Sequence, residues 1–189
     1  MGIRGDVPAT GRGGGGAPPP VQKSYAQAKP GMPVVRVIIG PTNAPPFKVD
    51  AVAVEDDTFN VLSANPDFQA RDASPAAMSR ALDALEDSEP HRLGSVVVKV
   101  GRPLIFQAIV HDLSRDPTCS EDSVRRALAA IFEEAERRRL KAIALPPVGT
   151  RYRSLDERRF LDLFNDALAR AAFRSVEQVW LIVPEGFGS

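Results

Sequence analysis

Short β-branched runs alternate with long amphipathic segments along most of this chain of 189 residues. Four of these runs have the length and composition of strands: PVVRVIIG (33–40), FKVDAVAVE (47–55), KAIALPP (141–147) and SVEQVWLIV (175–183). The segment 94–113 holds two more apolar runs around Gly101-Arg102-Pro103, a pattern typical of a hairpin. Strands that alternate with helices predict an α/β fold, and the hairpin makes its sheet mixed.

Three helices are predicted from their start signals and apolar stripes. The first begins at Ser74, with Pro75 at its first position. The second follows Ser120 as N-cap, and its stripe is Val124, Ala127, Leu128, Ile131, Phe132 and Ala135. The third begins with a capping box of Ser154 and Glu157, and its stripe is Phe160, Leu161, Phe164, Leu168 and Ala171.

Residues 1–33 differ in composition from the rest of the chain. Glycine and proline replace the apolar residues that a core would need, so this segment is predicted to be a disordered tail before a domain at 34–189. The tail is either a plain linker or a weakly basic arm for a partner.

Composition narrows the possible partners and compartments. Lys+Arg and Asp+Glu both number 24, so no net charge favours nucleic acid. Cys119 is the single cysteine, which excludes an intrachain disulfide and favours a reducing cytoplasm. The sequence shows no apolar run of the roughly 20 residues that a membrane helix needs. With His91 and His111 as the only histidines, neither a metal site nor a cofactor is expected.

The stretch LPPVGTRYRSLDE (145–157) has features of a phosphate loop before a helix. Gly149 allows a positive φ, Thr150 offers a hydroxyl and an N–H, and Arg151 and Arg153 offer charge. The carboxylates at 156 and 157 oppose an anion there because they already occupy the first turn of the helix. The loop is therefore either an anion site or a connection to a capped helix.

His111 and Asp112 stand together at the end of a predicted strand. Neighbouring residues on a strand point to opposite faces, so these two side chains are not expected to form a catalytic pair. We predict that His111 is a partly buried strand residue, and no catalytic residue is assigned.

Taken in order, these segments resemble a macro domain, the fold best known for binding ADP-ribose. The resemblance covers residues 34–183 and depends on VDAVAV (49–54), IFQAIVHDL (105–113) and KAIALPPVGTR (141–151), the last two each followed by a helix. It implies a three-layer α/β/α domain with a mixed sheet. It also implies a ligand site that includes Asp50, Gly149, Thr150, Arg151 and Arg153.

The sequence departs from the family at the residues that hold its ligand. Val54 and then Glu55 stand where the resemblance leads one to expect asparagine, and the stretch 62–75 contains no glycine for a diphosphate loop. We therefore favour a non-catalytic module that works through contacts with a protein partner and whose ligand pocket is closed or degenerate. The alternatives are a binding domain for ADP-ribose or another nucleotide-like phosphorylated ligand and, on weaker grounds, an ADP-ribosyl hydrolase.

Overall fold

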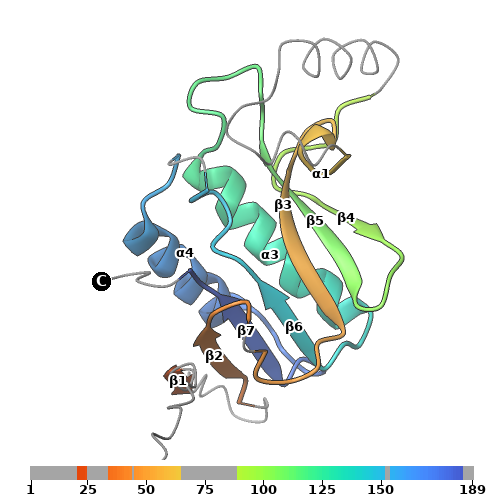
Figure 1. Cartoon of the computed structure of the whole chain (residues 1–189), viewed down its shortest axis with the longest axis vertical. Helices are drawn as coiled ribbons and strands as arrows, with labels where there is room; N and C mark the ends of the chain where they lie inside the picture. The colour runs from red at the N-terminus through yellow and green to blue at the C-terminus, as the bar shows by residue number, and fades with distance from the viewer. Residues whose placement is uncertain (1–20, 25–33, 44, 65–88, 152–153, 185–189) are drawn as a thin grey trace, which may run out of the picture.

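A seven-stranded sheet forms the centre of the computed structural model, which describes residues 21–24, 34–43, 45–64, 89–151 and 154–184 (Figure 1). The order of the strands across the sheet is β1-β2-β7-β6-β3-β5-β4. The strands are β1 (Val21–Ser24), β2 (Arg36–Gly40), β3 (Ala51–Asp57), β4 (Val96–Lys99), β5 (Leu104–His111), β6 (Ala142–Leu145) and β7 (Gln178–Ile182).

The five central strands run parallel, and an antiparallel strand lies at each edge. The predicted hairpin is confirmed, because β4 pairs with β5 across Gly101-Arg102-Pro103. Since β2, β7, β6, β3 and β5 all point the same way, their carboxyl ends meet at one end of the sheet. In open α/β sheets this end is the usual position of a ligand crevice.

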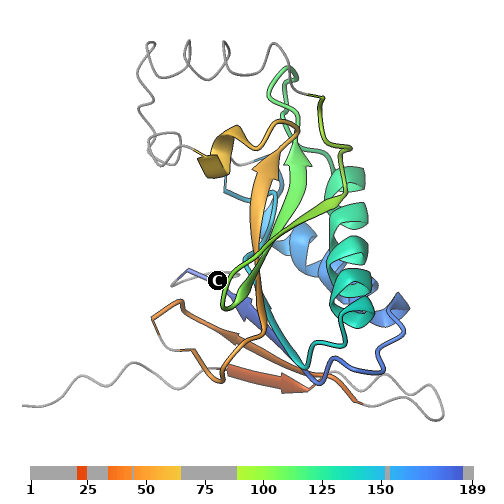
Figure 2. The same cartoon turned by 90° about the vertical axis from the view of Figure 1, so that its right-hand side faces the viewer.

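Helices α3 (Glu121–Arg137) and α4 (Glu157–Arg170) cover one face of the sheet, and the short α1 (Val61–Ala64) lies on the other (Figure 2). The mixed sheet and its helices agree with the predicted α/β fold. The helix expected from Ser74 lies outside the described residues. Among the helices that the structure describes, none is long and apolar enough to cross a membrane.

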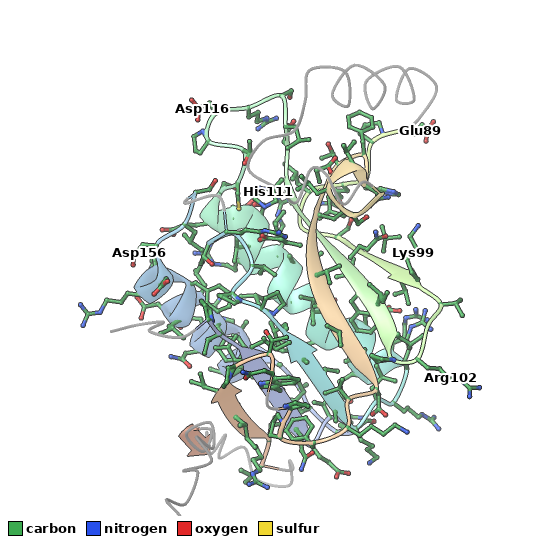
Figure 3. All side chains as sticks on the ribbon, viewed as in Figure 1. Glu89, Lys99, Arg102, His111, Asp116 and Asp156 are labelled. Atoms are coloured by element: carbon green, nitrogen blue, oxygen red, sulfur yellow. The ribbon has the colours of Figure 1, made fainter. Side chains whose placement is uncertain are left out.

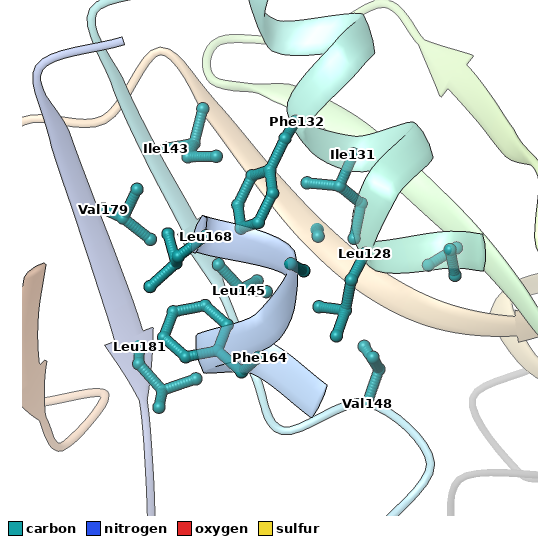
Figure 4. Packing of buried hydrophobic residues seen from close by; sticks show 14 of the residues in the cluster. Leu128, Ile131, Phe132, Ile143, Leu145, Val148, Phe164, Leu168, Val179 and Leu181 are labelled. Carbon is teal, nitrogen blue, oxygen red and sulfur yellow. The ribbon is translucent and has the colours of Figure 1, made fainter. Parts of the chain in front are cut away.

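The apolar faces of α3 and α4 meet β6 and β7 in a single core (Figure 4). Every predicted stripe residue of α3 is buried, from Val124 to Ala135. The ring of Phe132 lies 5.2 Å from that of Phe173 and 6.2 Å from that of Phe164, distances at which aromatic pairs attract. This core holds the sheet face toward the helices and so fixes the positions of the strand ends.

The start of α4 differs from the predicted capping box. Asp156, not Ser154, is the N-cap, and its carboxylate accepts hydrogen bonds from the backbone N–H groups of Arg158 and Arg159. The physical reason is that Leu155 is buried and its N–H donates to Gly149, which holds Ser154 in the preceding loop. The stripe shifts as well, because Leu163 and Ala167 are buried whereas Leu161 is only partly so.

The N-terminal segment contains one strand that its composition did not predict. Val21–Ser24 forms β1, which pairs antiparallel with β2 from Val21 opposite Ile39 to Ser24 opposite Arg36. Backbone pairing with a neighbouring strand satisfies N–H and C=O groups without requiring an apolar face, so composition alone did not reveal it. The rest of 1–33 lies outside the described residues.

Candidate ligand-binding site

A cavity of about 720 Å³ lies at the carboxyl ends of the central strands. It extends from Lys99 at the end of β4 to Val183 and Pro184 after β7, with Val54 and Gln107 between them. Figure 3 shows His111 at this end of the sheet, and Lys99 and Arg102 on the hairpin that joins β4 to β5. The volume lies within the range of pockets that hold small organic ligands.

The loop after β6 forms one wall of this cavity through Pro147, Thr150 and Arg151. Gly149 has a φ of +86°, the left-handed conformation that glycine permits. Its N–H donates to Oε2 of Glu55 at 2.8 Å, and the Thr150 hydroxyl donates to the Pro147 carbonyl at 2.7 Å. The donor of Gly149 is therefore bonded within the protein.

The positive end of α4 is also occupied. Asp156 accepts hydrogen bonds from the N–H groups of Arg158 at 2.9 Å and Arg159 at 3.1 Å. The helix after the loop is therefore capped by the protein itself. An anion in the cavity would depend on the side chains of Thr150 and Arg151, which line it. Arg153 lies outside the described residues.

Three consecutive acids end β3 next to the cavity. Asp57 is fully buried and accepts hydrogen bonds from the N–H groups of Phe59 and Leu62, which anchors the turn into α1. Asp56 is also fully buried, and its Oδ1 accepts from the N–H groups of Asp57 and Ser63. Burial raises the pKa of the Asp56 carboxyl group because the charged form loses its hydration.

Glu55, the third acid, connects the cavity to a buried histidine. Its Oε2 lies 3.6 Å from Nε2 of His111, whose Nδ1 lies 3.1 Å from the Thr118 hydroxyl. As predicted, His111 does not pair with Asp112, which bonds to Ser114 and Arg115 instead. His111 is more deeply buried than we expected, with no exposed surface. The Glu55–His111 contact was not visible in the sequence because the two residues belong to different strands.

Asp50 does not lie with the other predicted ligand residues. It precedes β3 at the amino end of the sheet, where its Oδ2 accepts hydrogen bonds from the N–H groups of Lys141 at 2.8 Å and Ala142 at 3.0 Å. It therefore joins β3 to the start of β6, with the length of both strands between it and the cavity. This position corrects the grouping of Asp50 with Gly149, Thr150 and Arg151.

The sequence did not single out Gln107, Asp56 and Lys99, which belong to the cavity or support it. Gln107 interrupts the apolar run IFQAIV, and a polar residue within a buried strand is a signal that could have been used. The three acids at 55–57 give a similar signal, because a strand rarely buries adjacent carboxylates without a partner. Within the described residues, no group of three His, Cys, Asp or Glu side chains could hold a metal ion.

The fold with this cavity at its strand ends is that of a divergent macro domain. A macrodomain of Oceanobacillus iheyensis, solved with ADP, has a TM-score of 0.62 at 11% identity, over 88% of this chain and 90% of that one. The macrodomain of Thermus aquaticus DarG has a TM-score of 0.56 at 22% identity, over 78% and 98% of the two chains. The sequence matches no protein-family model, and it matches no curated protein.

Proposed function

We propose that this domain binds a nucleotide-like phosphorylated ligand of the ADP-ribose class in the cavity at its strand ends. The observation that carries the proposal is the cavity itself, about 720 Å³, at the end of a parallel sheet where α/β proteins hold their ligands. A similar macrodomain was solved with ADP, which supports the same class of ligand. Our sequence-based preference for a protein-interaction module assumed a closed or degenerate pocket, and the open cavity favours ligand binding instead.

The cavity wall carries charges of both signs, with Lys99 at the end of β4 and Arg151 on the β6–α4 loop as its basic residues. Arg151 is exposed beside Thr150 on the β6–α4 loop, and these two side chains suit a phosphate. Glu55 and Glu157 also line the cavity, and their carboxylates oppose an anion close to them. We therefore place the phosphates near Thr150 and Arg151, with the less charged part of the ligand over β3 and β5.

We propose binding without turnover. Val54 faces the cavity at the place where the resemblance leads one to expect an asparagine, and its side chain can neither donate nor accept a hydrogen bond. A hydrolase needs groups that hold and activate a water molecule. The carboxylate of Glu55 accepts a hydrogen bond from the Gly149 N–H through Oε2, so we assign it the role of holding the β6–α4 loop in place.

Titration calorimetry of the full chain with ADP-ribose and ADP tests the proposal. We expect saturable binding in the micromolar range, and at least tenfold weaker binding after the double change Arg151→Ala, Arg153→Ala, which corresponds to about 1.4 kcal/mol. Arg158→Ala is the matched control, because this exposed arginine on α4 does not line the cavity. The control should bind as the parent does.

Two results would contradict the proposal. One is the absence of saturable binding of either ligand by the parent chain. The other is equal weakening by the loop variant and by Arg158→Ala, since that would indicate a general effect of net charge on association. In either case a protein partner becomes the better explanation of the fold.

A further inference from the structure

Gln107 is a buried polar side chain in the wall of the cavity. It lies on β5 with only 5% of its surface exposed, between Phe106 and Ala108, which face the helical layer. Because side chains alternate along a strand, Gln107 faces the other side of the sheet, where Val54 of β3 is its neighbour. Its carbonyl oxygen, Oε1, is buried and has no hydrogen-bond partner among the described residues.

The orientation of the Gln107 amide is fixed from the opposite side. Nε2 donates to Oδ2 of Asp56 at 2.8 Å and also to the hydroxyl of Ser63. Turning the amide over would bring Oε1 against the Asp56 carboxylate, and two acceptors would then face each other. Asp56 therefore determines that Nε2 of Gln107 is bonded within the protein and that Oε1 faces the cavity without a partner among the described residues.

We propose that Gln107 is a specificity-determining residue of the cavity and that its Oε1 accepts a hydrogen bond from an N–H or O–H group of the ligand. This inference rests on the proposed function. It adds that the ligand must present a hydrogen-bond donor to Gln107. A buried acceptor without a partner is unfavourable, and a ligand donor removes that penalty. A phosphate cannot do so, because its oxygens are acceptors.

The apolar residues of the cavity agree with a neutral donor. Val54, Leu62 and Ile105 line the cavity together with Gln107 and Ser63, and the first three are apolar. In such surroundings a hydrogen bond to Oε1 contributes more to discrimination than a similar bond in water, because a ligand with an acceptor at that point leaves two groups unpaired. An amine of a base and a hydroxyl of a sugar both have the required chemistry.

Asp56→Asn is expected to change the group that Gln107 presents to the cavity from an acceptor to a donor. Residue 56 itself does not line the cavity. The oxygen Oδ1 of Asp56 accepts two backbone N–H groups, so the amide oxygen of the new side chain stays there and its NH₂ group faces Gln107. The Gln107 amide then turns its oxygen toward this NH₂ group and presents Nε2 to the cavity. The variant offers a donor where the parent offers an acceptor.

The experiment measures affinities of the full chain for two pairs of ligands by calorimetry. ADP lacks the second ribose of ADP-ribose and with it the hydroxyl donors of that sugar, whereas IDP has an oxo group in place of the amine on the base of ADP. We expect the parent to prefer the donor-bearing member of one pair by at least tenfold, and that pair identifies the donor. In Asp56→Asn the preference should vanish or reverse.

Gln107→Met provides a second variant, since it keeps the length of the side chain and removes the amide. In this variant the two ligands of the discriminating pair should bind with nearly equal affinity. The ratio of affinities within the other pair should stay as in the parent. Asp112→Asn is the matched control, because it makes the same exchange in a residue that does not line the cavity. Thermal melts of each variant verify that it is folded.

The outcomes separate the two proposals. If the parent binds none of the ligands, the proposed function fails and this inference fails with it. If the parent binds but discriminates within neither pair, or if the variants weaken both members of the discriminating pair equally, Gln107 has only a structural role. In that case the proposed function still stands.

Discussion

Gly149 offers the most direct test of how the core supports the cavity loop. We consider Gly149→Ala, which adds one methyl group. A Cβ atom at this position would lie 2.7 Å from Cγ2 of Val124 and 3.1 Å from Sγ of Cys119. Both neighbours are buried, so neither can move aside without disturbing the packing of α3.

Two effects add to the cost of this substitution. A side chain in the left-handed conformation, here with a φ of +86°, costs about 1–2 kcal/mol. Forcing an additional methyl group into a packed core costs about 1–3 kcal/mol. The expected loss in the free energy of unfolding is therefore about 2–5 kcal/mol, measured by urea denaturation at constant m-value.

A double-mutant cycle separates the two effects. Val124→Ala removes the methyl group that lies nearest to the new Cβ, so the closest contact should disappear in the double variant, while the backbone strain and the contact with Sγ of Cys119 stay. We expect a favourable coupling of about 1 kcal/mol or more between the two substitutions. Additivity within about 0.5 kcal/mol, or a loss below about 1 kcal/mol for Gly149→Ala alone, would refute the reasoning.

Two further predictions concern the ends of the helices on the same face. Asp156→Ala should lower the free energy of unfolding by about 1 kcal/mol in denaturant titrations because α4 loses its N-cap, whereas Ser154→Ala should leave it nearly unchanged. A larger loss for Ser154→Ala than for Asp156→Ala would instead indicate that Ser154 is the N-cap, as the sequence predicted. Cys119 should react with a thiol reagent on the order of 100-fold more slowly in the native protein than in denaturant, because burial raises the pKa of its thiol and Glu55 adds to the shift. Equal rates would show that Cys119 is accessible.

The helices and strands could be predicted because their signals are local. The stripe on α3 and the turn at Gly101-Arg102-Pro103 each depend on residues near one another in the sequence, and both were predicted correctly. The start of α4 was misplaced because Ser154 and Asp156 are both good caps, and the burial of Leu155 decides between them. That decision depends on tertiary packing.

The cavity was harder to predict because its residues come from separate strands. Gly149 and Thr150 were predicted as ligand residues from a local loop pattern; Thr150 lines the cavity, and Gly149 bonds to Glu55, which also lines it. Asp50 was grouped with them through the resemblance alone, and it lies at the other end of β3. The Gln107–Asp56 bond joins residues 51 positions apart, so only the register of β3 against β5 brings them together.

The pairing of β1 with β2 has a consequence for how this domain behaves when it is shortened. Without β1, the outer side of β2 would present a row of unpaired N–H and C=O groups, which can recruit a strand from another molecule. We therefore expect residues 21–24 to protect the edge of β2 from pairing with another molecule. A chain cut after residue 20 keeps this protection, whereas one cut after residue 33 loses it and is at risk of forming intermolecular sheets even if its core is intact.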